Sequence, residues 1–308
     1  MEAASDSGTS KASSLRWKIL RQAILPRLSS QNPDDESQTG IRSVSRKATK
    51  GFNLIPFQLL HEDSQSRDAR LCYTLPTPGS PKLVLTQRVD NCADLKDFEI
   101  CNEYNIDNTG LVCQWPSEDV LAYFCLSHAD IFRSRRVIEL GSGYGLAGLV
   151  IAATTEALEV LITDGNPQVV DYIQHNVDAN FEVFGDTKVK SMTLHWNQDE
   201  ISNLSNTFDV IIASDCTFFK EFHKDLARTV QCLLKNVGSS EAIFFSPKRG
   251  DSLDKFLEEI KETGLHFSIT EYYDAEIWKR HQGLMKGDHD WPGYVKDHCY
   301  PLLVRVTR

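Results

Sequence analysis

Short apolar segments and longer amphipathic segments alternate through the second half of the chain. Short runs of mostly apolar residues predict strands at 137–140, 159–164, 189–196, 209–214, 242–247, 266–273 and 302–307. Between them, apolar residues recur every three or four positions, which predicts helices at 145–155, 167–180, 222–236 and 252–263. This alternation favours an α/β fold with a doubly wound, seven-stranded and mostly parallel sheet.

The chain before residue 106 has a different pattern. Residues 1–50 predict a poorly ordered arm, in which Leu15 to Leu28 form a basic amphipathic helix. That helix either stays in solvent, contacts a surface or serves as an import signal. Residues 51–105 predict a β-rich lead-in with short strands at 54–60, 70–75 and 82–89. Residues 106–308 form the main domain, and Ser117 is expected to cap its first helix.

Composition and charge narrow the class of protein. The chain has 308 residues, of which 41% are hydrophobic and 25% charged, as is typical of a globular protein. Its net charge of -10 argues against a general attraction to nucleic acid, and no apolar run reaches the roughly 18 residues of a membrane span. None of its eight cysteines forms a C-x-x-C pair. We therefore expect reduced thiols, a cytoplasmic and also nuclear location, and a monomer.

A glycine-rich turn follows the first core strand and predicts a nucleotide site. Glycines alternate there with other residues, at Gly141, Gly143 and Gly145, and Ser142 separates the first two. Such a turn bends tightly and exposes main-chain amides to a ligand. A dinucleotide fingerprint needs its third glycine at position 146, and no Lys-Ser or Lys-Thr pair follows, so dinucleotides and triphosphates are disfavoured. Glu139, inside the strand, suits a cation or an ammonium group; the alternative is an ordinary strand–helix turn.

Residues at the ends of the next two strands suit a nucleoside. Asp164 stands about 20 positions beyond the glycines, where a carboxylate accepts hydrogen bonds from ribose hydroxyls or else caps the following helix. Gly165 and Asn166 complete that turn. The ring of Trp196 would cover an adenine face, and Trp115 precedes the first helix of the main domain, where its ring would close over the rest of the ligand. Each tryptophan is otherwise a core residue.

The end of the fourth strand predicts the reacting centre. Asp215 stands at the carboxyl end of that strand, beside the switch point where parallel sheets bind their ligands. Ser214 is small enough to let a ligand approach, and Phe218 and Phe219 would line an apolar channel. The alternative is that Asp215 caps the helix predicted from residue 222, although it stands several residues too early for that.

Taken together, these motifs resemble a known enzyme family. The pattern E-x-G-x-G-x-G, from Glu139 to Gly145, is similar to motif I of the class I S-adenosylmethionine-dependent methyltransferases. With Trp115, Asp164 and Trp196 added, the chain resembles the seven-β-strand protein-lysine methyltransferases over about residues 53–308. Within that group, the segment 215–219 and the tail from residue 278 are most similar to enzymes that methylate calmodulin.

The resemblance implies a cofactor, a substrate and a set of site residues. The cofactor is S-adenosylmethionine and the protein partner is calmodulin, and the last strand of the sheet is antiparallel. The implied catalytic residues are Asp215 and Phe218. The implied cofactor-binding residues are Trp115, Glu139, Gly141, Ser142, Gly143, Gly145, Asp164, Gly165, Asn166, Trp196 and Ser214.

We expect Asp215 to orient the attacking lysine amine, with water removing its proton. Relatives often carry tyrosine where this chain has Phe218, so a hydroxyl that would orient the amine is absent. Calmodulin is acidic, so docking needs local positive surface, although each candidate is otherwise a solvated face. The candidates are the basic clusters Arg42-Arg46-Lys47-Lys50, Arg133-Arg135-Arg136 and Lys279-Arg280.

Three other functions share some of these features. A methyltransferase acting on a small molecule, a nucleic acid or another protein would carry the same cofactor motifs, and a non-catalytic module would bind the cofactor without transfer. A metal enzyme is not expected, because His281, His289 and His298 are not spaced as ligands and are interpreted as surface residues. Intact Glu139 and Asp164 argue against a decayed site.

Overall fold

The described part of the chain contains the whole predicted sheet. The computed structural model describes residues 51–62, 68–88, 95–104, 106, 108–112, 115–196, 201–287, 291 and 293–308. The arm predicted at 1–50, with its amphipathic helix and its basic cluster, lies outside the described residues, as does His289. Among the described residues, no helix is long and apolar enough to cross a membrane.

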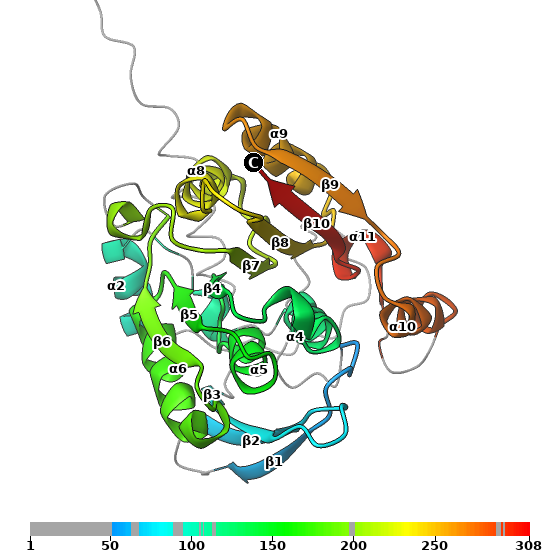
Figure 1. The fold of residues 1–308 in the computed structure, drawn as a ribbon. Coiled ribbons are helices and arrows are strands. Elements are labelled where there is room, and N and C mark those ends of the chain that lie inside the picture. The colour runs from blue at the N-terminus through cyan, green and yellow to red at the C-terminus, as the bar shows by residue number, and fades with distance from the viewer. Residues whose placement is uncertain are drawn as a thin grey trace, which may run out of the picture.

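Seven strands form the central sheet, in the order β6-β5-β4-β7-β8-β10-β9 (Figure 1). Strands β4 to β8 pair in parallel, whereas β10 is antiparallel to both β8 and β9. This confirms the prediction of a doubly wound, mostly parallel sheet with an antiparallel last strand. The bounds are β4 Arg136–Leu140, β5 Glu159–Asp164, β6 Lys188–Thr193, β7 Val210–Ser214, β8 Glu241–Ser246, β9 His266–Thr270 and β10 Leu302–Thr307.

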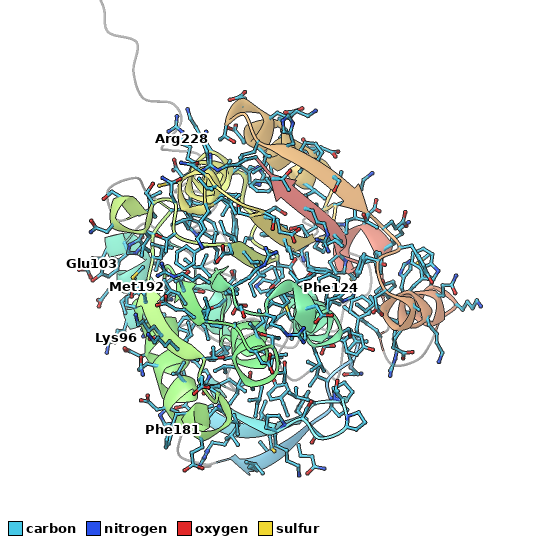
Figure 2. All side chains as sticks on the ribbon, viewed as in Figure 1. Lys96, Glu103, Phe124, Phe181, Met192 and Arg228 are labelled. Atoms are coloured by element: carbon cyan, nitrogen blue, oxygen red, sulfur yellow. The ribbon has the colours of Figure 1, made fainter. Side chains whose placement is uncertain are left out.

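Helices cover both faces of this sheet. Side chains alternate along β7, so that Val210 and Ile212 join one core cluster and Ile211 and Ala213 join the other. Because both faces are covered, the strand reads as a continuous apolar run. In Figure 2, Phe124 lies in the interior and the exposed Phe181 lies at the edge. The first face carries α4 (Pro116–Ser127), α5 (Leu146–Thr154) and α6 (Pro167–Asn180), and the second carries α8 (His223–Leu233) and α9 (Ser252–Glu262).

The β-rich lead-in is also confirmed, as a separate three-stranded antiparallel sheet of β1 (Phe57–Glu62), β2 (Asp68–Thr74) and β3 (Lys82–Arg88). Two side chains of α6 attach it to the main domain. The Asn180 amide accepts from the Val84 nitrogen at 2.8 Å and donates to the Val84 carbonyl at 2.7 Å. Asn176 bonds the Thr86 backbone in the same way. These amides satisfy edge-strand groups that would otherwise lack partners. The domain boundaries stay predictions.

Several element ends differ from the sequence predictions. Helix α4 begins at Pro116, which suits the first helical position because its missing N–H needs no partner there, so the prediction that Ser117 caps the helix is wrong. The third core strand ends at Thr193, short of Trp196. Four helices were not predicted: α2 (Leu95–Tyr104), α3 (Thr109–Val112), α10 (Ala275–Met285) and α11 (Lys296–Cys299).

Candidate functional site

A pocket lies at the carboxyl ends of the parallel strands, beside the switch point between β4 and β7. The strands that follow β4 in the chain add on opposite sides of it, and doubly wound sheets bind ligands at this point. The lining comes from segments that follow β4, β5, β6 and β7, from the start of α4 and from residues between 104 and 110. It includes every predicted site residue except Glu139 and Gly145: Trp115, Gly141, Ser142, Gly143, Asp164, Gly165, Asn166, Trp196, Ser214, Asp215 and Phe218.

The glycine turn after β4 forms the floor of the pocket. Gly141 and Gly143 have φ values of 59° and 58°, in the left-handed region that favours glycine. A Cβ added to Gly141 would lie 2.8 Å from the Cys216 sulfur and 3.4 Å from the Trp196 ring. The turn is tied to the next strand, because the Ser142 nitrogen donates to the Thr163 carbonyl at 3.0 Å. The backbone is therefore exposed to the pocket at a position where a side chain would fill it.

Asp164 connects the glycine turn to the turn after β5. Its Oδ2 accepts from the Gly143 nitrogen at 3.1 Å, and its Oδ1 accepts from the Asn166 nitrogen at 2.9 Å. The Asn166 side chain in turn caps α6 by accepting from the Gln168 nitrogen at 3.0 Å. The helix-capping role considered for Asp164 therefore belongs to Asn166, and the carboxylate of Asp164 faces the pocket.

Aromatic rings form the wall above β6. Trp196 is half-buried and meets Phe222 edge to face, with the ring centroids 6.2 Å apart. Next to it, the rings of His195 and Tyr104 stack in parallel at 5.5 Å. Flat, stacked rings of this kind form a surface on which a nucleobase packs well. Tyr104 comes from α2, a helix that the sequence did not predict.

Asp215 and the aromatic residues after it form the opposite end of the pocket. Asp215 has a φ of 57° and is buried, and its Oδ2 accepts from the Ser117 nitrogen at 3.3 Å. Its Oδ1 lies 2.5 Å from Nη1 of Arg249. Phe218 packs against Trp115, with the ring centroids 5.5 Å apart, and against Phe219 at 4.7 Å. A carboxylate is therefore set among aromatic rings at this end.

Comparison with known proteins identifies the family. The sequence profile described as lysine methyltransferase matches residues 96–263, which is more than half of the chain. The chain belongs to the lysine methyltransferase family. It is 66% identical over 305 residues to calmodulin-lysine N-methyltransferase from Arabidopsis thaliana, a match covering 98% of this chain and 99% of that protein. It is 28% identical over 171 residues to protein-lysine N-methyltransferase EEF2KMT from Mus musculus, covering 52% of this chain and 51% of that protein.

Solved structures with a similar fold include two methyltransferases. An S-adenosylmethionine-dependent methyltransferase from Mesorhizobium loti has a TM-score of 0.42 at 16% identity, covering 61% of this chain and 98% of that chain. The ribosomal protein L11 methylase from Lactobacillus delbrueckii subsp. bulgaricus has a TM-score of 0.43 at 15% identity, covering 63% and 80%.

The pocket of this lysine methyltransferase fits S-adenosylmethionine, the cofactor of its family. Two buried polar atoms of the lining, Oγ of Ser142 and Nδ2 of Asn166, have no hydrogen-bond partner among the described residues. Buried polar atoms are rarely left in this state, so they are available to a polar ligand. Asp164 adds an acceptor for ribose hydroxyls, and the Trp196 ring adds an apolar face. The residues present therefore match a nucleoside carrying a polar amino-acid arm.

Glu139, predicted to contact the cofactor, is not among the residues that line the pocket. Its side chain is buried, and Oε2 accepts from the Gly148 nitrogen in the first turn of α5 at 2.8 Å. Burial raises the pKa of Glu139 well above its usual range, and nearby Glu118 and Asp164 raise it further. Gly145 also lies outside the lining, as the N-cap residue of α5, against Ile162. In this lysine methyltransferase both residues contact α5 or the neighbouring strand, next to the glycine turn.

The pocket also contains residues that the sequence did not single out. Two acids, Glu118 at the start of α4 and Asp225 on α8, line it together with His195 and Tyr104. No spacing rule connects Glu118 to Asp215. Arg249 lies behind the Asp215 end. Its contact depends on the pairing of β7 with β8, which one sequence does not reveal.

One histidine interpretation is wrong. His281, predicted to lie on the surface, is buried on α10, with Nδ1 2.7 Å from the Tyr294 hydroxyl and its ring against Tyr300. Burial lowers its pKa, because the charged imidazolium would lose hydration. His298 is exposed, as predicted. No group of three metal-binding side chains gathers within the residues that the structure describes.

Proposed function

We propose that this lysine methyltransferase transfers methyl groups from S-adenosylmethionine to a lysine side chain of calmodulin. The observation that supports this substrate most strongly is the 66% identity to the Arabidopsis thaliana calmodulin-lysine N-methyltransferase, because it extends over nearly the full length of both proteins. Similarity confined to the cofactor motifs would not favour one substrate over another.

One end of the pocket would hold the methyl donor; we call it the donor end, and it comprises residues 141–143, 164–166, 195 and 196. S-adenosylmethionine supplies a methyl carbon bonded to a positively charged sulfur. Asp164 would accept hydrogen bonds from the ribose, and the glycine turn would approach the ligand with backbone alone. Trp196 would cover the base. Asp215, which lines the other end of the same pocket, would then be available to the acceptor.

The acceptor end, comprising Trp115, Asp215, Phe218 and Phe219, would receive the lysine. The amine must be neutral to attack, and neutralising it at pH 7.4 from an ordinary pKa near 10.4 costs about 4 kcal/mol. Aromatic rings lower this cost because the ammonium loses hydration among them. Asp215 would orient the amine by accepting a hydrogen bond, and water would remove the proton. Alignment of amine, carbon and sulfur is then the main contribution of the protein.

The basic clusters that the structure describes, at 133–136 and 279–280, contain side chains that are paired with acids. Arg136 begins β4, at the opposite end of the strand from the glycine turn, and it pairs with Glu159 at 2.8 Å. Lys279 and Arg280 both pair with Glu276, the latter at 3.0 Å. These clusters therefore do not support the proposed docking of an acidic partner, and the cluster at 42–50 lies outside the described residues.

Incubation with labelled S-adenosylmethionine and purified calmodulin, followed by peptide mass mapping, tests the proposal. We expect label on calmodulin, at one or few lysines, and none on free metabolites or RNA in parallel reactions. If a protein of a cell extract is labelled and calmodulin is not, the proposed substrate is wrong. The proposed reaction, methylation of a lysine, would still hold. Binding of S-adenosylmethionine without transfer to any acceptor would indicate a binding module.

A further inference from the structure

A buried arginine stands behind the acceptor end. Arg249 follows β8, and its Nη1 lies 2.5 Å from Oδ1 of Asp215, with the two side chains only 8% and 2% exposed. Arg249 does not belong to the pocket lining. A buried ion pair is costly to form, and it is retained when its geometry is needed.

Several contacts fix the position of this arginine. Its guanidinium lies 4.8 Å from the centroid of the Trp115 ring and 5.2 Å from that of Phe218. Its backbone nitrogen donates to the Asp297 carbonyl at 2.7 Å. Arg249 and Asp215 have φ values of 42° and 57°, a region that non-glycine residues rarely adopt, so the surrounding contacts must hold both backbones in place. The cation is therefore held against both aromatic walls and the carboxylate.

The charge of Arg249 addresses a conflict in the mechanism. A carboxylate beside a lysine favours the ammonium form, which cannot attack the methyl group. Besides Asp164 at the donor end, the lining adds two acids, Glu118 on α4 and Asp225 on α8, and within the described pocket it contains no lysine or arginine. Without a nearby cation, this end of the pocket would hold the substrate amine in its inert form.

We propose that Arg249 is a positioning residue that offsets the charge of Asp215, so that Asp215 orients a neutral amine without stabilising the ammonium. This inference rests on the proposed function, since it needs a lysine amine beside Asp215. An arginine suits the task better than a lysine because it stays charged, stacks on aromatic rings and binds a carboxylate in a fixed plane.

The other titratable groups near the pair are few. Cys216 lines the pocket next to Asp215, and Cys299 of α11 interacts electrostatically with both Arg249 and Asp215. Burial raises the pKa of the Cys299 thiol, which keeps it uncharged near neutral pH. Asp164 lies at the donor end. The acids Glu118 and Asp225 are present in all the variants described next, so they do not account for a difference between those variants.

The test is the pH dependence of single-turnover methylation of calmodulin by wild type, R249Q and R249K, at saturating S-adenosylmethionine from about pH 6.5 to about pH 10. We expect R249Q to move the midpoint of the profile upward by about one unit or more, with the rate near neutral pH about tenfold lower and recovering at alkaline pH. R249K keeps the charge, so its midpoint should stay within about 0.3 unit of wild type even if its rate falls.

A matched control is R88Q. Arg88 pairs with Asp97 at 2.8 Å, with side chains 4% and 2% exposed, and neither residue lines the pocket. Breaking this pair should lower the stability of the fold to a similar degree and leave the pH midpoint unchanged. D215N is the reciprocal variant: it leaves the arginine charge without its partner, so the midpoint should fall below that of wild type.

An R249Q rate that is reduced equally at every pH would overturn the proposal, because a purely structural role has that signature. If R249Q fails to fold, the pH profile of D215N tests the proposal instead. An unchanged midpoint of that profile would count against the inference. A wild-type enzyme that labels no calmodulin refutes the proposed substrate instead. The role of the arginine is then measured by the binding of n-butylamine to the S-adenosylhomocysteine-loaded protein across the same pH range. R249Q should again move the midpoint of binding upward. An unmoved midpoint would refute the role of Arg249.

Discussion

The two ends of the pocket are built in different ways. The donor end is made of backbone amides and short turns, each beside the strand that ends there: Gly141 after β4, Asp164 at the end of β5. The acceptor end is assembled from side chains of distant segments, with Trp115 before α4, Asp215 after β7 and Arg249 after β8. The first depends on local backbone conformation. The second depends on how strands and helices pack.

The strongest way to break the donor end is G141A. Its Cβ would collide with the Cys216 sulfur, so we expect S-adenosylmethionine to bind at least about 100-fold more weakly, which is about 3 kcal/mol. G185A is the matched control, because Gly185 has a similar φ of 56° but no atom within 4 Å of its added Cβ. Both variants lose about 1 kcal/mol of stability through backbone strain. Equal affinities for the cofactor in the two variants would contradict the assignment of the donor end.

D215N separates the acceptor end from the donor end. The substitution preserves shape but removes the charge that orients the amine, so kcat should fall about 100-fold. The affinity for S-adenosylmethionine, measured by calorimetry on the same preparation, should change less than about threefold, because Asp164 and the glycine turn are untouched. Breaking a buried pair also lowers stability, so folding is checked by circular dichroism. A large loss of cofactor affinity with unchanged kcat would reverse the roles of the two ends.

Helix α4 supplies Glu118 to the pocket and begins directly after Trp115, and Asp119 anchors it. The Asp119 carboxylate accepts from the Leu54 nitrogen at 2.9 Å and the Ile55 nitrogen at 3.2 Å. Burial raises the pKa of Asp119 from 3.8 to about 6. Because the folded pKa is raised, protonated Asp119 favours the folded state at low pH, and this contribution is lost as pH rises from about 4 through about 6.

D119N removes that titration. The free energy of unfolding of D119N minus that of wild type should therefore increase by about 2 kcal/mol between about pH 4 and pH 7, a value reduced from the full shift because the side chain is partly exposed. Urea unfolding at the two pH values measures the difference. If the free energies of unfolding of D119N and wild type differ by the same amount at both pH values, Asp119 does not titrate in this range.

The smallest effect is expected for F218Y at the acceptor end. The ring of Phe218 already packs between Trp115 and Phe219, and an added hydroxyl changes little volume, so kcat should stay within about threefold of wild type. F218A is the contrasting variant, because it removes the ring that Arg249 and Trp115 contact. A tenfold or larger effect of the tyrosine on kcat would mean that this position orients the amine directly.

The sequence predicted the strand ends and turns of the donor end well, because their backbone is determined by neighbours in the chain. An apolar run ending in glycines specifies a buried strand and a tight turn, and Asp164 ends the next such run. The α/β order followed from the same alternation. Helix α10 was missed, although Asp274 caps it by accepting from the nitrogens of Glu276 and Ile277. Its buried face places a histidine, His281, between Ile277 and Leu284, which weakens the apolar period that a sequence shows.

The failures share one physical cause, which is that one sequence does not show what packs against a side chain. Glu139 stands inside a strand, but its direction is set by α5, where Gly148 leaves room for the carboxyl and a Cβ would lie 2.7 Å from it. His281 looks solvated until Tyr294 and Tyr300 enclose it. Arg249 was not singled out, because its partner Asp215 lies on another strand.

Calorimetric titration of S-adenosylmethionine into wild-type protein and D164A tests the central claim most directly. A carboxylate that joins the glycine turn to β5 and accepts from the ribose should account for most of the affinity. We therefore expect one site per chain in wild type and at least about 100-fold weaker binding in D164A. No heat with folded wild-type protein, or equal affinity in the two proteins, would contradict it.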